Sequence, residues 1–237
     1  MKVLVIIPAY NEEKSLKGLL DRLTDACPEY DVVVVNDCSS DNTLNVCKKW
    51  GVSVIDLPVN LGIGGAVQSG YRYARYKGYD IAVQVDGDGQ HDPKYISMLK
   101  SELDKGANLS IGSRFITGEG FQSSRVRRYG IKYFSNLIYL FTGLRITDPT
   151  SGFRACDRKA IRLFADDYPR DYPEPESIVN AVKHNLKVSE VPVIMKHREE
   201  GTSSITSSKT LYYMIKVSLA IVIASFFRHN NSEVKLP

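Results

Sequence analysis

The sequence lacks several features that would each point to a class of protein. Its four cysteines, Cys27, Cys38, Cys47 and Cys156, are not spaced like the paired ligands of a zinc site. The N-terminus goes directly into an apolar run with no signal peptide, so we expect reduced thiols in a cytosolic protein. A net charge of +4 over 237 residues is too small to indicate a nucleic-acid-binding protein.

The chain also lacks an apolar run long enough to predict a membrane-spanning helix. Lys216 interrupts the most apolar stretch, and the remaining part, 217–227, is shorter than the about 20 residues that a span needs. We expect residues 209–229 to form an amphipathic helix that lies in a membrane interface or docks on a partner subunit. The alternative is a helix that closes the domain or forms an oligomer contact. Residues 230–237 are expected to be a disordered tail.

Short apolar runs alternate with helical patterns along most of the chain. This alternation predicts an α/β fold with a mostly parallel sheet flanked by helices. The expected helices begin near residues 16, 43, 62, 93, 125 and 173. The expected strands are residues 3–7, 31–35, 52–57, 81–85, 107–111 and 188–195.

Ligands of such sheets bind at the carboxyl ends of the strands. The loops after the first, second and fourth expected strands should therefore converge on one edge, and they carry Tyr10, Glu12, Asp37, Asp86 and Asp88.

The fourth expected strand ends in two aspartates, Asp86 and Asp88, each followed by a glycine. Strand side chains alternate between faces, so residues two apart can point the same way. Two carboxylates this close suit a hard cation, Mg²⁺ or Mn²⁺, which binds carboxylates together with substrate phosphates. The alternative is a solvated Asp/Gly turn.

The glycine-rich stretch Gly62-Ile63-Gly64-Gly65 matches neither the dinucleotide-binding fingerprint nor a Walker loop. We interpret it as a helix N-terminus kept small for close packing near the site. A direct ligand contact is the alternative.

Six segments of the chain together resemble one known family. Four of them resemble the inverting family-two glycosyltransferases of GT-A fold: Pro8-Ala9-Tyr10-Asn11-Glu12, Val35-Asn36-Asp37-Cys38-Ser39-Ser40-Asp41-Asn42-Thr43, Asn60-Leu61-Gly62-Ile63-Gly64-Gly65-Ala66 and Val85-Asp86-Gly87-Asp88-Gly89-Gln90-His91-Asp92-Pro93. Two later segments resemble the branch that includes dolichol-phosphate mannose synthase and bacterial polyprenyl-phosphate glycosyltransferases: Gly112-Ser113-Arg114-Phe115 and Thr147-Asp148-Pro149-Thr150-Ser151-Gly152-Phe153-Arg154. The resemblance implies a GT-A domain over residues 1–208.

The resemblance also implies a role for each matching residue. Asp86 would contact the nucleotide-sugar or the metal, and Asp88 would bind the metal that bridges the diphosphate. Gln90 and His197 are candidate further metal ligands, although the alternative for His197 is a solvated loop. The residues that would line the base and ribose are Pro8, Tyr10, Glu12 and Asp37.

Residues 125–141 combine arginines at one end with aromatic and apolar residues along one helical face. Guanidinium groups match phosphate oxygens, and an aromatic amphipathic surface suits a membrane interface. The resemblance implies that Arg114, Arg128 and Lys132 hold an acceptor phosphate. The alternative is an amphipathic core helix with a solvated basic end.

Asp148 is the candidate general base that inverting transfer to a hydroxyl group requires. A phosphate acceptor is already ionised, so with that acceptor Asp148 would instead orient the acceptor or stabilise charge. The alternative is a structural role, because Asp-Pro is a common start of a turn.

The resemblance as a whole implies a metal-dependent enzyme that moves a sugar from a UDP- or GDP-sugar to undecaprenyl or dolichyl phosphate. We expect a peripheral protein at the cytoplasmic face of the membrane, and a small membrane subunit and a second copy of the chain are candidate partners. One alternative is transfer to a saccharide hydroxyl in cell-wall or surface-polysaccharide synthesis. The other is a non-catalytic subunit that binds a nucleotide-sugar.

Overall fold

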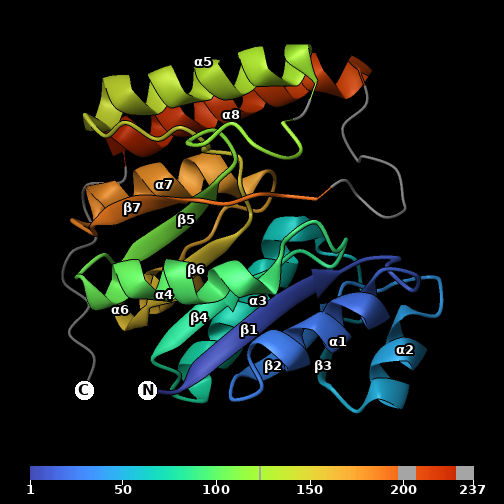
Figure 1. Ribbon diagram of the computed structural model, residues 1–237. Coiled ribbons are helices and arrows are strands. Elements are labelled where there is room, and N and C mark those ends of the chain that lie inside the picture. Colours follow the sequence, from blue (N-terminus) through green and yellow to red (C-terminus); the bar gives the residue numbers. More distant parts are fainter. Residues whose placement is uncertain (123, 197–206, 228–237) are drawn as a thin grey trace.

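A computed structural model describes residues 1–122, 124–196 and 207–227 (Figure 1). The strands are β1 (Val3–Ala9), β2 (Asp31–Asn36), β3 (Ser53–Asp56), β4 (Ile81–Gln84), β5 (Leu109–Ser113), β6 (Arg154–Asp157) and β7 (Val188–Pro192). The helices within the same residues are α1 (Leu16–Ala26), α2 (Thr43–Trp50), α3 (Gly62–Tyr76), α4 (Ile96–Asp104), α5 (Arg125–Thr142), α6 (Arg158–Asp166), α7 (Pro173–Lys183) and α8 (Ser207–Phe227), with a short 3-10 helix, η1 (Pro93–Tyr95), before α4.

The strands of the described residues form one seven-stranded sheet in the order β3-β2-β1-β4-β6-β5-β7. Four neighbouring pairs are parallel, and β6 is antiparallel to both β4 and β5. The prediction of a mostly parallel α/β sheet is confirmed. The sequence did not predict β6 or α6, because the four residues of β6 begin and end with a charged side chain and show no apolar run.

Alternate side chains of each strand enter two separate cores. Val5 and Ile7 of β1 belong to a core with α1, α2 and α4. Leu4 and Ile6 of the same strand belong to a core with α3, α5, α6, α7 and α8. The two-residue period of the strand therefore places helices on both faces of the sheet, as the alternating pattern predicted.

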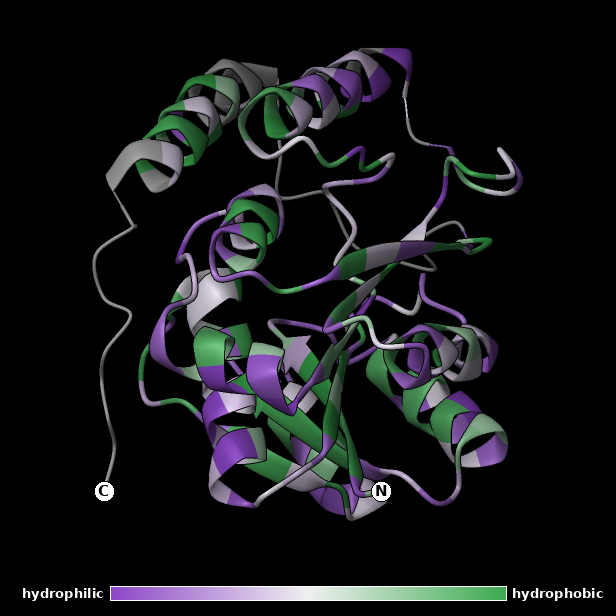
Figure 2. Cartoon of the chain, turned by 90° about the vertical axis from the view of Figure 1, so that its left-hand side faces the viewer, coloured by the Kyte–Doolittle hydropathy of each residue, from purple (hydrophilic) through white to green (hydrophobic). Residues whose placement is uncertain are grey.

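Helices α5 and α8 lie side by side above α7 (Figure 1, Figure 2). Val217 and Ile221 of α8 are buried in this packing, and Lys216 pairs with Asp171. The outer side of α8 carries three apolar residues that are more than half exposed, Ile215, Leu219 and Ile223. In the described part of residues 209–229, one face of the helix therefore closes the domain and a second face presents exposed apolar side chains.

No helix among the described residues is both long enough and apolar enough to cross a membrane. The expected tail, residues 230–237, lies outside the described residues.

The glycine-rich start of α3 is a packing feature, as interpreted from the sequence. A Cβ atom on Gly64 would overlap the backbone carbonyl oxygens of Pro169 and Arg170. The Gly64 N–H also donates to Arg170 O at 3.1 Å. The loop between α6 and α7 can approach α3 this closely only because position 64 has no side chain.

Gly64→Ala should therefore lower the free energy of unfolding by about 1–3 kcal/mol, the usual cost of overpacking. Urea unfolding measures this change. The matched control is Gly18→Ala in α1, where the new Cβ would meet only the end of Arg22 at 3.6 Å. That substitution should raise helix stability by about 0.5–1 kcal/mol. Equal stability of the Gly64→Ala variant and the wild type would contradict the packing interpretation.

Candidate functional site

The loops after β1, β2 and β3 meet at the carboxyl edge of the sheet, as the strand order requires. Asp37, at the end of β2, is 3% exposed, and its N–H donates to Ala9 O at 2.9 Å. Its Oδ1 accepts from the Leu61 N–H at 2.7 Å, and its carbonyl accepts from Asn60 Nδ2 at 3.1 Å. Asp37 thus holds the segment before α3 against the end of the strand.

The loops after β1 and β2 are tied to each other by hydrogen bonds. Asn11, which has a left-handed φ of 57°, accepts from the Ser40 N–H through Oδ1 at 2.8 Å. The Glu12 N–H donates to Thr43 Oγ1 at 2.8 Å. Tyr10 directly precedes these two anchored residues and is 52% exposed. The loop therefore presents an aromatic ring to solvent from a fixed backbone.

The two aspartates after β4 reach the same edge beside the β1 loop. Gly87, between them, lies where an added Cβ would be 3.1 Å from Pro8 O and 3.3 Å from Glu12 Cγ. The Asp86 side chain is 33% exposed, whereas Asp88 is 5% exposed. The structure therefore brings the predicted nucleotide-binding loops and the predicted metal ligands together.

Gln90 and Asp88 form a local turn, because Asp88 Oδ1 accepts from the Gln90 N–H at 3.0 Å. Gln90 Nε2 donates to Lys196 O at 3.0 Å, so a ligand role for Gln90 would fall to its Oε1. The remaining predicted ligand, His197, lies outside the described residues.

A glycine from a distant segment supports the Asp86 carboxylate. An added Cβ on Gly152 would lie 2.8 and 2.9 Å from the two carboxylate oxygens of Asp86. The backbone at Gly152 therefore lies directly against the Asp86 carboxylate, and position 152 has no room for a side chain.

The donor atoms at this edge fit a hard divalent cation. The described residues hold no cluster of three His, Cys, Asp or Glu side chains that could ligate one ion. Asp86 and Asp88 follow β4 at this edge and supply two carboxylates. A combination of one or two carboxylates with phosphates and water is typical of Mg²⁺ sites.

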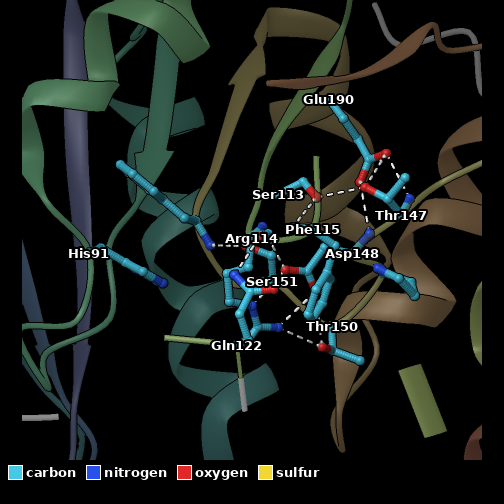
Figure 3. Close-up of polar contacts among 12 residues, drawn as sticks. His91, Ser113, Arg114, Phe115, Gln122, Thr147, Asp148, Thr150, Ser151 and Glu190 are labelled. Carbon is cyan, nitrogen blue, oxygen red and sulfur yellow. Dashed lines mark hydrogen bonds and ion pairs between the residues drawn. The ribbon is translucent and has the colours of Figure 1, made fainter. Parts of the chain in front are cut away.

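Arg114 and Asp148 form a buried ion pair that neither residue's position in the sequence predicted (Figure 3). Arg114 Nε donates to Asp148 Oδ2 at 2.6 Å, and Nη2 donates to Oδ1 at 2.7 Å. The Arg114 N–H and the Thr150 hydroxyl also donate to this carboxylate. Burial alone lowers the pKa of Arg114, but the bonds to Asp148 outweigh it, so the net shift of the pKa is upward. The guanidinium stays charged in the dry environment.

Glu190 of β7 holds the same loop from the other side (Figure 3). Its carboxylate accepts from the N–H groups of Thr147 and Asp148 at 2.7 and 2.9 Å. The Thr147 hydroxyl also lies 2.6 Å from Ser113 Oγ at the end of β5. Burial raises the pKa of Glu190, and the two backbone N–H groups oppose that increase. The 147–150 loop is therefore anchored to both β5 and β7.

These contacts give Arg114 and Asp148 different partners from those expected. Arg114, expected to hold an acceptor phosphate, is 6% exposed and directs two of its nitrogens to Asp148. Asp148, the candidate base, has no exposed surface and accepts hydrogen bonds on both oxygens. Arg128 and Lys132, the other predicted phosphate ligands, are exposed one turn apart on α5.

The aromatic residues of α5 divide between core and surface. Phe134 and Ile138 are fully buried, which confirms the core-helix interpretation for that face. Tyr129 is 77% exposed beside the basic residues.

Arg154 is a functional candidate that the sequence analysis left unassigned. Its guanidinium is fully buried and donates to Ser151 O, Pro149 O, Glu174 O and Ser177 Oγ at 2.7–3.2 Å. It therefore joins the segment before β6 to the start of α7. Its sequence position, at the end of the Thr-Ser-Gly-Phe-Arg motif, was the only available signal.

Glu174, at the start of α7, provides a prediction about pH. Burial raises its pKa from 4.5 to about 6, although nearby Arg154 opposes the increase. The pKa of Glu174 is higher in the folded state than in the unfolded state. The contribution of protonated Glu174 to the free energy of unfolding is therefore full below about pH 4.5 and is lost as the pH rises through about 6. Glu174→Gln should therefore gain about 1 kcal/mol in free energy of unfolding relative to the wild type between pH 5 and pH 7.

Urea unfolding at the two pH values measures the gain. Glu119→Gln is the control, because Glu119 is exposed. The same difference between the Glu174→Gln variant and the wild type at both pH values would contradict the prediction.

Known proteins of similar sequence match most of this chain. Residues 4–167 match glycosyl transferase family 2. The polyprenol monophosphomannose synthase of Mycolicibacterium smegmatis is 32% identical over 227 residues, covering 92% of this chain and 86% of the relative. The undecaprenyl-phosphate mannosyltransferase of Micrococcus luteus is 34% identical over 215 residues, covering 87% and 88%.

A solved structure shows the same fold. Glucosyl-3-phosphoglycerate synthase from Mycobacterium tuberculosis, in complex with Mn²⁺, uridine-diphosphate and phosphoglyceric acid, superposes with a TM-score of 0.71. The match covers 94% of this chain and 78% of that chain at 19% identity. The predicted GT-A fold is therefore confirmed. The family match over residues 4–167 agrees with relatives that align with nearly the whole chain. The chain therefore belongs to glycosyl transferase family 2.

Proposed function

We propose that this protein transfers a sugar from a nucleoside diphosphate sugar to a polyprenyl phosphate. The observation that carries the proposal is the meeting of Asp86 and Asp88 with the β1 and β2 loops, directly against the 147–153 segment. Two relatives that match most of the chain are named for transfer of mannose to a polyprenyl carrier. Acidic residues suit the metal-bound diphosphate of the donor, and the exposed cations of α5 suit the phosphate of the acceptor.

The donor nucleotide would lie on the loops after β1 and β2. Tyr10 offers an exposed ring for stacking on the base, and Glu12 and Asp37 offer carboxylates for the base and ribose. Pro8 fixes the backbone beneath them. Because hydrogen bonds already hold both loops, little ordering is needed when the nucleotide binds.

Asp86 and Asp88 would hold Mg²⁺ or Mn²⁺ beside the diphosphate, with Gln90 Oε1 and His197 as further candidates. When bound, the cation would neutralise the negative charge that develops on the departing nucleoside diphosphate. The absence of a side chain at Gly152 leaves room for the Asp86 carboxylate, since an added Cβ would lie 2.8 Å from Oδ2.

The acceptor phosphate would be held by the exposed cations Arg128 and Lys132. They lie one helical turn apart on α5, so both can reach one phosphate group. Arg114 and Asp148 would act as a buried pair that positions the 147–150 loop beside the sugar. A phosphate oxygen is already ionised and needs no base, which agrees with the hydrogen-bonded state of Asp148.

We also propose that α5 and α8 face the cytoplasmic surface of the membrane that holds the lipid. Exposed apolar side chains lie on both helices, with Leu140 74% exposed on α5 and Ile215, Leu219 and Ile223 on α8. A cluster of exposed apolar groups beside basic residues suits a lipid interface.

A transfer assay tests the proposed function. The purified chain would be given radiolabelled UDP- or GDP-sugars, Mn²⁺ or Mg²⁺, and undecaprenyl or dolichyl phosphate in detergent. We expect label in a lipid product, loss of transfer with EDTA, and at least a roughly 100-fold loss for Asp88→Ala. Asp104→Ala, which removes an exposed carboxylate on α4, should leave transfer unchanged. Label in a saccharide instead of the lipid would contradict the proposed acceptor.

The same assay separates the acceptor site from the donor site. Arg128→Ala should raise the KM for polyprenyl phosphate about tenfold and leave the KM for the nucleotide-sugar unchanged, because one charge-assisted bond to phosphate is lost. Arg162→Ala, at an exposed position on α6, is the matched control.

The buried pair gives a separate prediction about stability. Asp148→Asn should lower the free energy of unfolding by about 3 kcal/mol or more, since it leaves a buried guanidinium uncompensated. The control is Asp166→Asn, which removes the exposed pair with Arg75 and should cost less than about 1 kcal/mol. Urea unfolding measures both. Loss of transfer by Asp148→Asn with wild-type stability would favour the base role.

A further inference from the structure

His91 follows the aspartate pair in the same loop and is 4% exposed. The family resemblance gave it no role, and the proposed function does not use it. A buried imidazole normally satisfies its two nitrogens with specific partners. Figure 3 labels this ring. Its two nitrogens both lie near Asp86: Nδ1 near the backbone N–H and Nε2 near the carboxylate.

The backbone of Asp86 determines which ring nitrogen carries the proton. The Asp86 N–H donates to His91 Nδ1 at 3.1 Å, so Nδ1 acts as an acceptor. The proton of the neutral ring is therefore on Nε2. Nε2 lies 3.7 Å from Asp86 Oδ2, so its N–H faces the carboxylate at a distance longer than a hydrogen bond.

Residues from outside the loop hold the ring and the carboxylate in this arrangement. The His91 ring stacks on Phe153 with centroids 4.8 Å apart and an angle of 10° between the planes. Phe153 is fully buried, and its carbonyl accepts from the Gly112 N–H at 2.8 Å. On the other side of the carboxylate, Gln84 Nε2 lies 3.2 Å from Asp86 Oδ1 and donates to it.

We propose that His91 is a positioning residue that sets the orientation of the Asp86 carboxylate for binding of the nucleoside diphosphate and its divalent cation. The inference rests on the proposed function, since it concerns the same donor. One ring contacts both the backbone and the side chain of Asp86, and Phe153 prevents the ring from turning. A carboxylate that is oriented before the donor arrives loses less conformational freedom on binding.

Two substitutions of His91 separate the parts of this role. His91→Phe keeps a flat ring on Phe153 but removes both nitrogens. His91→Asn keeps an acceptor near the position of Nδ1. The matched control is His184→Asn, because His184 makes its Nδ1 contact with Asn180 O at the end of α7.

The first measurement is calorimetric binding of UDP and of GDP, each with Mn²⁺ and without acceptor. We expect His91→Phe to bind at least about tenfold more weakly than the wild type, and His91→Asn to recover most of the loss. His184→Asn should bind like the wild type. Equal affinity of His91→Phe and the wild type would overturn the inference while leaving the proposed function intact. Failure of the wild type to bind either nucleotide would overturn both.

The second measurement does not depend on metal or nucleotide. Long-range ¹H–¹⁵N spectra of the metal-free protein report the protonation of each ring nitrogen. We expect His91 with an unprotonated Nδ1 and a protonated Nε2. A proton on Nδ1 would overturn the inference whatever the binding data show, because Nδ1 could then not accept from Asp86.

Discussion

The buried ion pair between Arg114 and Asp148 joins the end of β5 to the 147–150 loop. Removing two charges from water costs several kcal/mol, and only close, complete hydrogen bonding recovers that cost. Here the carboxylate accepts from two guanidinium nitrogens and a backbone N–H, and Glu190 holds the backbone of Asp148. The pair therefore fixes the end of β5, the 147–150 loop and β7 in one arrangement. The segment that reaches Asp86 through Gly152 follows directly from that loop.

Acidic and basic side chains lie in adjoining segments of this region. The acidic side chains of Asp86 and Asp88 follow β4 at the sheet edge, and the buried guanidinium groups of Arg114 and Arg154 donate to residues 148–151 of the adjoining segment. Three of the hydrogen bonds described for the Arg154 guanidinium go to backbone carbonyl oxygens. These acceptors carry no formal charge, so they do not neutralise the positive charge of Arg154. Such a charge holds down the otherwise larger increase in the pKa of Glu174.

The sequence was sufficient for the parts of the structure that depend on local pattern. Short apolar runs predicted every strand of the described residues except β6, and the expected parallel α/β arrangement placed Asp37, Asp86 and Asp88 at one edge. The unpredicted contacts join residues far apart in the chain: Arg114 and Asp148 are 34 residues apart. The environment of His91 likewise depends on Phe153, and the inner face of α8 can be recognised only once α5 and α7 are in place.

The antiparallel direction of β6 has a consequence for how such a protein can diversify. Chain leaving β5 after Ser113 and chain entering β6 at Arg154 pass the same edge of the sheet, because the two strands run in opposite directions. Everything between them, including α5, is an excursion that starts and finishes at the site. The described residues between Arg114 and Asp148 contain no strand, so the length and composition of that part can change while the ion pair and the strand pairing are kept. If α5 holds the acceptor as proposed, a change of acceptor would need the replacement of only one continuous segment, while the loops proposed to hold the donor stay the same.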